Sequence, residues 1–206
     1  MPQQPFLSTI VLAALVGSST TIVFFKTFDI SEEKTNEELI EEFYKVENAV
    51  HVSPHSLRKQ LDEGGTNVLI VDLRSAEEYE REHIIGAINI PAYSDPDTSA
   101  YSEVDRIVNQ FKEAIETNPN KEIVTYCYSI PCMTGRKIGK LLADHGIYVK
   151  TLNIGWNEWR HFWTLWNHEH EWETTNPEDY IWSGKEPGTP KIKDMLSPCG
   201  EGEFGC

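Results

Sequence analysis

Residues 68–91 read VLIVDLRSAEEYEREHIIGAINIP, and this stretch decides the fold class. From Asn67 to Arg74 the chain is almost continuously apolar, which is typical of a strand buried on both faces of a parallel sheet. The acidic segment from Ser75 to His83 predicts a short helix, and residues 86–91 predict another strand. A strand, a helix and a strand in this order indicate an α/β protein with a central parallel sheet flanked by helices.

The same alternation continues on both sides of this stretch. Ser53 and Pro54 have the N-cap and N1 pattern of a helix that ends at Gly64 and Gly65. Function in such sheets lies at the carboxyl ends of the strands, and Cys127 ends one of them. The further predicted elements are strands at 50–52, 122–127 and 149–154 and helices at 102–116 and 136–145, the last capped by Gly146.

The charge of the chain excludes one class of partner. There are 33 acidic and 18 basic side chains, which give a formal net charge of -15. A negative surface repels nucleic-acid phosphates, so we expect no nucleic-acid partner. The length of 206 residues suits one well-filled soluble domain.

An uncharged stretch near the N-terminus, FLSTIVLAALVGSSTTIVFF from Phe6 to Phe25, predicts a membrane helix. A helix of about 20 residues crosses the hydrocarbon core of a bilayer. A cleaved signal peptide fits less well, because MPQQP lacks Lys and Arg and no A-x-A site follows. We expect a single-pass anchor over residues 1–28, with the soluble domain on the periplasmic or extracytoplasmic side. Lys26 and Lys34 follow the span, and basic residues favour the cytoplasmic side, so a cytoplasmic placement of the domain is the alternative.

Residues 29–47 predict an acidic helical spacer, because their apolar side chains recur at helical spacing. These apolar residues are Leu39, Ile40, Phe43, Tyr44 and Val46.

Two segments resemble the rhodanese-like domain family. Residues 68–91 resemble its D-x-R, E-E-Y and H-I-x-G-A-x-N-I-P motifs. EIVTYC at 122–127 and VKTLNIGWNEW at 149–159 resemble its cysteine-ending strand and its closing G-G-x-x-x-W turn. The resemblance covers residues 48–166 and implies a three-layer domain in which Asp72 and Arg74 support the active side of the sheet. Departures from the pattern are Glu82 where glycine is common and Gly155 where two glycines are common.

The loop after Cys127 is longer than the common family form, which has four residues between cysteine and arginine. Arg136 is therefore not the usual loop arginine. The loop resembles that of a subgroup in which a second cysteine, here Cys132, follows five positions later. The predicted loop and substrate-binding residues are Tyr128, Ser129, Ile130, Pro131, Cys132, Met133, Thr134, Gly135 and Arg136.

The resemblance implies sulfur transfer by Cys127. Its thiolate would take a sulfane sulfur from a small donor anion such as thiosulfate and pass it to cyanide or a thiol. Backbone N–H groups at the start of the following helix are expected to lower the pKa of the thiol. No cofactor is implied, and the sequence does not identify a protein partner.

Two other functions are compatible with the same loop, and a third is excluded by its spacing. A dithiol redox site could use Cys127 and Cys132, although the spacing is not C-x-x-C. A non-catalytic binding module is the other alternative, because an altered loop can turn a catalytic fold to recognition. A phosphatase that uses a cysteine and an arginine needs five residues between these two side chains. The spacing from Cys127 to Arg136 is longer than this, and the spacing from Cys132 to Arg136 is shorter, so this function is excluded.

Residues 167–206 form an acidic C-terminal extension rich in Trp and Gly. Trp159, Trp163 and Trp166, at helical spacing, predict a core-facing stripe. Residues 188–206 are turn-rich and expected to be loose, and Cys199 and Cys206 could form a disulfide in an oxidising compartment. A metal could be bound by His161, His168, His170, Glu169 and Glu171, but histidines in an acidic stretch are expected to be solvated, so no metal site is predicted.

Overall fold

The computed structural model describes residues 33–95 and 97–193. The chain divides into two compact units, residues 1–44 and 45–206. Helix α2 (Asn36–Val50) begins in the first unit, and none of its side chains is buried. A helix is thus confirmed in the predicted spacer, but it begins seven residues after the predicted start and ends three residues after the predicted end. Within the described ranges no helix has both the length and the apolar character that a bilayer crossing requires. The membrane helix predicted at residues 6–25 lies outside those ranges.

A parallel sheet of five strands forms the centre of the second unit, in the order β1-β6-β5-β2-β4. Val68 and Ile70 of β2 lie in one hydrophobic cluster, whereas Leu69 and Val71 lie in the cluster on the other face. This burial on both faces explains why β2 is apolar at nearly every position. The strands are β1 (His51–Val52), β2 (Val68–Asp72), β4 (Ile88–Asn89), β5 (Glu122–Tyr126) and β6 (Lys150–Leu152).

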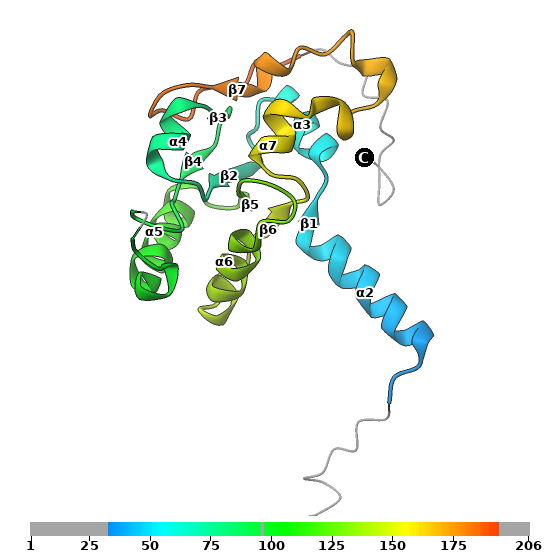
Figure 1. Ribbon diagram of the computed structural model, residues 1–206, viewed down its shortest axis with the longest axis vertical. Coiled ribbons are helices and arrows are strands. Elements are labelled where there is room, and N and C mark those ends of the chain that lie inside the picture. Colours follow the sequence, from blue (N-terminus) through cyan, green and yellow to red (C-terminus); the bar gives the residue numbers. More distant parts are fainter. Residues whose placement is uncertain (1–32, 96, 194–206) are drawn as a thin grey trace, which may run out of the picture. The chain divides into compact units, whose positions relative to one another are not determined.

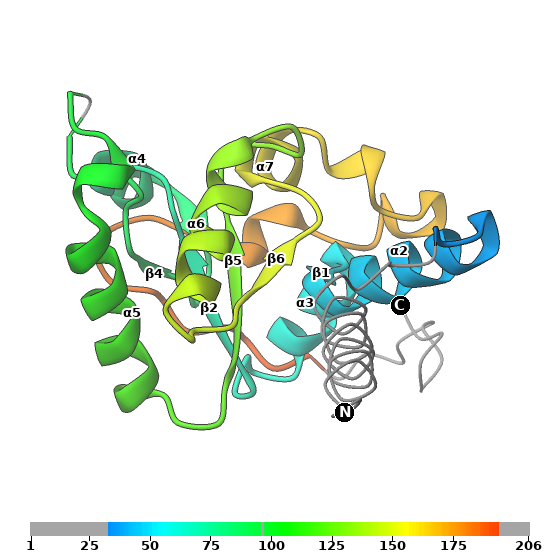
Figure 2. The same ribbon diagram turned by 90° about the horizontal axis from the view of Figure 1, so that it is seen from below.

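Helices cover both faces of this sheet, as Figure 1 shows. On one side lie α3 (Pro54–Asp62), α4 (Ala76–Arg81) and α7 (Trp156–His161), and on the other α5 (Val104–Thr117) and α6 (Met133–Asp144). The view in Figure 2 places α5 and α6 in front of the strands. The predicted three-layer α/β architecture is therefore confirmed. Short 3-10 helices complete the unit: η1 (Ala100–Ser102), η2 (Trp163–Leu165), η3 (Glu169–Glu171) and η4 (Pro177–Tyr180).

Helix α6 begins at Met133, three residues before the predicted start. Cys132 occupies the N-cap with an extended backbone, φ -64° and ψ 114°. Arg136 consequently lies one turn into the helix instead of at its first residue. The second half of the cysteine loop is thus helical, which brings backbone N–H groups close to Cys132.

The described part of the C-terminal extension packs onto the sheet unit. Strand β7 (Ile181–Trp182) pairs antiparallel with β3 (His83–Ile84), and Tyr180 is buried. Lys193 N–H donates to the Asp62 carbonyl at 2.9 Å. Residues 188–193, the described part of the end that was expected to be loose, have no regular secondary structure, but this bond of Lys193 holds them to α3.

The tryptophan stripe is part of the core, as predicted. Trp159 and Trp163 are buried in the cluster on the α3 side of the sheet, and Trp166 packs against them. Helix α7 ends at His161 and Trp163 begins η2, so two elements carry the stripe. The aromatic rings form contacts among themselves, with Trp159 and Trp166 stacked at 5.1 Å between centroids.

Candidate functional site

Cys127 directly follows the last residue of β5 and starts a loop that lies against the beginning of α7. The Cys127 carbonyl accepts a hydrogen bond from Trp156 N–H at 2.8 Å. A Cβ atom at Gly155 would lie 2.1 Å from the backbone nitrogen of Ser129. Only glycine leaves room for this approach, so Gly155 determines how closely the loop packs.

A carboxylate that the sequence analysis did not single out holds the middle of the loop. Glu158 accepts hydrogen bonds from Gly155 N–H at 2.9 Å and from Ile130 N–H at 3.4 Å. From the other side, Arg136 Nη1 donates to the Ile130 carbonyl at 3.1 Å and to the Cys132 carbonyl at 3.4 Å. The signal for Glu158 was present in the sequence, because a glutamate three residues after an N-cap is the capping-box position.

The predicted loop residues differ in exposure. The Tyr128 hydroxyl donates to the carboxylate of Glu78, a second partner that sequence reasoning missed and that no local pattern indicates. The exposed loop residues are Tyr128, Ile130, Pro131, Met133 and Arg136, the half-buried ones are Ser129, Cys132 and Thr134, and Cys127 and Gly135 are buried.

The two thiols are free and in hydrogen-bond contact, but their acidities differ. Cys127 is only 5% exposed. This burial raises the pKa of Cys127 to about 12, and the neighbouring Cys132 acts in the same direction. The pKa of Cys132 is lowered: burial opposes the shift, but hydrogen bonds from Cys127 and Thr134 outweigh it. The predicted low pKa of Cys127 is therefore wrong, because burial of this thiol outweighs the backbone N–H group that lowers its pKa.

A cavity of about 20 Å³ lies beside both thiols. Such a volume holds about one water molecule. It is too small for a donor anion with five heavy atoms such as thiosulfate. Its lining residues are His51, Cys127, Ser129, Ile130, Cys132, Gly135, Arg136, Thr151, Leu152, Asn153 and Ile154. A wider hollow of about 710 Å³ lies beside α6 and β6, but neither thiol lines it.

Asp72 and Arg74 form a buried ion pair beneath this edge of the sheet. Arg74 Nη2 lies 2.7 Å from Asp72 Oδ2, and both side chains are almost fully buried. The Tyr126 hydroxyl donates to the same Asp72 oxygen at 2.6 Å, one residue before Cys127. The Arg74 guanidinium lies 4.3 Å from the ring centroid of Trp156. These contacts tie the ends of β2 and β5 to the start of α7, in keeping with the supporting role that the resemblance implied.

The geometry can be compared with known proteins. A model of the rhodanese-like domain matches residues 53–162. The chain belongs to the rhodanese-like domain family. This match begins at the N-cap of α3 and ends directly after α7, so it contains the whole sheet except β1. The rhodanese-like fold inferred from the motifs is thus confirmed.

Relatives of this rhodanese-like chain carry different functions. An HTH-type transcriptional regulator of Mycobacterium tuberculosis is 34% identical over 93 residues, 45% of this chain and 34% of the regulator. The match therefore spans about a third of the regulator's length. A thiosulfate:glutathione sulfurtransferase of Saccharomyces cerevisiae is 29% identical over 118 residues, 55% of this chain and 80% of that protein. The solved structure of the BH2092 protein from Bacillus halodurans is 25% identical, with 61% of this chain and 81% of that chain covered and a TM-score of 0.46.

Proposed function

We propose that this rhodanese-like domain is a sulfurtransferase that moves a sulfane sulfur from a donor anion such as thiosulfate to a thiol or cyanide, through Cys132 and Cys127. The observation that carries the proposal is the cavity of about 20 Å³ beside the two thiols. This volume accommodates one additional sulfur atom but is too small to admit the complete donor anion. Membership of the family and the likeness to a thiosulfate:glutathione sulfurtransferase support this reaction class.

The sulfur enters at Cys132. Its lowered pKa makes the thiolate available, and its partial exposure lets a donor reach it. The exposed Arg136 side chain, which bonds the Cys132 carbonyl, supplies positive charge for an anion. The Cys132 thiolate attacks the sulfane sulfur of thiosulfate, a new S–S bond forms, and the bond to the sulfite group breaks. The products are a Cys132 persulfide anion and sulfite.

The sulfur then moves to Cys127. The Cys127 sulfur attacks the outer sulfur of the Cys132 persulfide, the S–S bond to Cys132 breaks, and the proton of Cys127 passes to the outer sulfur. This gives a neutral Cys127 persulfide and a Cys132 thiolate, with no change in total charge or in oxidation state, and the charge stays on the more acidic thiol. The buried position of Cys127 shields the persulfide from water. The reverse step returns the sulfur to Cys132, where a thiolate or cyanide takes it.

Peptide mass spectrometry of the full chain after incubation with thiosulfate tests the relay. We expect the wild type to gain one sulfur. Cys127→Ser should gain it on Cys132, whereas Cys132→Ser should gain none on Cys127, because the Cys127 thiol is buried and weakly acidic. Cys199→Ser is the matched control and should gain sulfur as the wild type does.

Other outcomes distinguish the alternatives. If Cys132→Ser gains sulfur on Cys127 at the wild-type rate, the order of the relay is wrong. A loss of two hydrogens that links the two cysteines favours the dithiol redox function, which their contact also permits. If no form gains sulfur, the domain is not a sulfurtransferase for this donor class, and a binding role remains.

We also propose that residues 6–25 anchor the chain as a single membrane span, with the domain on the extracytoplasmic side. The support is the absence of any charged residue in this part of the sequence. In membranes from expressing cells, the full chain should resist carbonate extraction and be cleaved by protease added from the extracytoplasmic side. Release by carbonate, or protection from that protease, would contradict the anchor or its orientation.

A further inference from the structure

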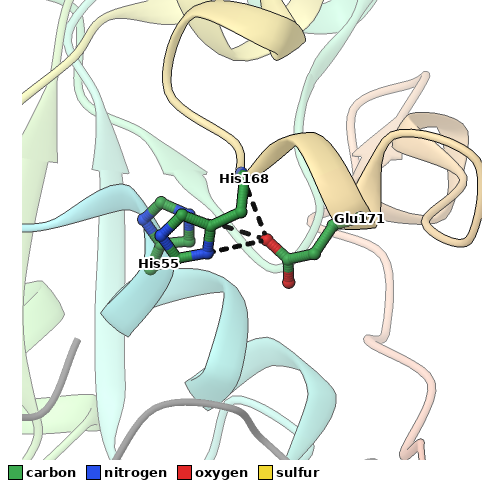
Figure 3. A group of neighbouring side chains, drawn as sticks. All are labelled: His55, His168 and Glu171. Carbon is green, nitrogen blue, oxygen red and sulfur yellow. Dashed lines mark hydrogen bonds and ion pairs between the residues drawn. The ribbon is translucent and has the colours of Figure 1, made fainter.

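Three potential metal ligands from distant parts of the chain meet beside α3, as Figure 3 shows. His55 lies in the first turn of α3, His168 directly precedes η3, and Glu171 ends η3. One ligand atom from each lies within 4.8 Å of the other two. Glu171 Oε2 is 3.3 Å from His168 Nδ1 and 3.8 Å from His55 Nε2.

The His55 imidazole is held in place, and its Nε2 atom faces the group. Nε2 is buried, and none of the described residues forms a hydrogen bond with it. The ring stacks on that of His168 at 4.5 Å and contacts the Trp166 ring edge-on at 5.5 Å. In a neutral imidazole ring, a nitrogen at this position can offer its lone pair to a metal ion. A buried nitrogen without a partner is costly unless a ligand satisfies it.

The carboxylate of Glu171 is oriented by a second layer of contacts. The buried Arg58 guanidinium binds Glu171 Oε1 and also the side-chain oxygen of Asn167. The other oxygen, Oε2, faces both imidazoles, and among the described residues the backbone N–H of His168 donates to it at 3.3 Å. Such outer contacts fix the direction of a metal ligand before the ion arrives.

We propose that His55, His168 and Glu171 bind a divalent transition-metal ion of the zinc type, with a fourth position open to water. Two imidazoles and one carboxylate are a ligand set that Zn²⁺ uses in sites that keep an open position. Metal–ligand bonds of roughly 2.1 Å in a tetrahedron place ligand atoms about 3.4 Å apart. The separations of 3.3 and 3.8 Å from Glu171 Oε2 are close to this value, and all three ligand atoms lie within 4.8 Å of one another. The two stacked rings must turn so that both nitrogen lone pairs point at one ion.

The half-exposed His168 gives the ion a way in from solvent, whereas His55 and Glu171 are largely buried. Residues 161–171 alone predict solvated histidines, because the stretch is acidic and does not contain every ligand. The deciding ligand, His55, stands 113 residues before His168 in the chain. A bound ion would join α3 to the segment after α7 and stabilise that contact.

Zn²⁺ titration of the purified full chain by calorimetry tests the site. The wild type should bind one more equivalent than His168→Ala, with an affinity about 100-fold or more above any residual binding in that variant. Glu171→Gln should lose the same equivalent. His161→Ala, an exposed histidine at the end of α7, is the matched control and should bind as the wild type does.

Two further measurements make the result decisive. Zn²⁺ should raise the melting temperature of the wild type but not that of His168→Ala. Addition of Co²⁺ should give the wild type an absorption spectrum that His168→Ala does not show. This spectrum should contain no sulfur-to-cobalt charge-transfer band, which would exclude the cysteines as ligands. Glu171→Gln leaves Arg58 without its charge partner and can unfold, but His168→Ala removes a half-exposed ring and avoids that problem. Equal Zn²⁺ binding by His168→Ala and the wild type, or none by either, would overturn the proposal.

Discussion

Replacing Gly155 by alanine should destabilise the domain through a clash with the cysteine loop. The added Cβ would lie 2.1 Å from the Ser129 nitrogen and 2.5 Å from the Tyr128 carbonyl carbon. Contacts of a carbon atom are normally about 3.5 Å or more, so the backbone must move by more than about 1 Å. Overpacking costs roughly 1–3 kcal/mol, and because the clashing atoms are backbone atoms, which cannot rotate away as a side chain can, we expect a cost near 3 kcal/mol. For a domain of this size, that corresponds to a fall in melting temperature of about 6–12 °C.

Thermal denaturation of the full chain, followed by circular dichroism, measures this effect. The matched control is Gly139→Ala in α6, where the new Cβ would meet only Val149 Cγ2 at 4.0 Å. Alanine in a helix interior is favoured over glycine by roughly 0.5–1 kcal/mol, so this variant should melt at the wild-type temperature or slightly above it. A Gly155→Ala chain that melts no lower than the wild type would show that the loop does not depend on this close approach.

Other substitutions and pH test the remaining parts of the site. Asp72→Ala leaves Arg74 buried without its partner and should lower the free energy of unfolding by about 3–5 kcal/mol in urea titrations, whereas Asp144→Ala, which removes an exposed pair, should cost at most about 1 kcal/mol. With its lowered pKa, Cys132 should keep more thiolate at neutral pH than an ordinary thiol. Its alkylation by iodoacetamide should therefore fall less between pH 9 and pH 7, and Cys127 should react more slowly throughout. Equal labelling rates for the two thiols would contradict the assigned acidities.

The fold could be predicted largely because its signals are local. The apolar run in β2 reflects burial on both faces, and the Ser53–Pro54 pair begins α3 where a capping residue and a proline should. The position of Cys127 at a strand end followed from the same pattern. Strand β7 has only two residues and pairs with another two-residue strand, so no periodicity could reveal it.

The chemistry of the thiols depends on contacts between distant segments. A strand end followed by a helix indicates a place where a thiolate is stabilised. The pattern does not tell which of two neighbouring cysteines has the lowered pKa. Burial of Cys127 results from the approach of its loop to Gly155, 28 residues later in the chain. The meeting of His55 with Glu171 likewise needs the packed structure, because sequence spacing relates only residues within one element.

The pairing of β7 with β3 bears on where the minimal folding unit ends. A fragment cut at residue 162, the end of the family match, would lose Trp163 and Tyr180 from the core on the α3 side. It would also leave Asp62 buried without the Tyr180 hydroxyl, which donates to it at 2.9 Å. Expression boundaries drawn from the family alone would therefore yield an aggregation-prone fragment, and a soluble domain must extend to about Lys193, whose N–H still bonds α3.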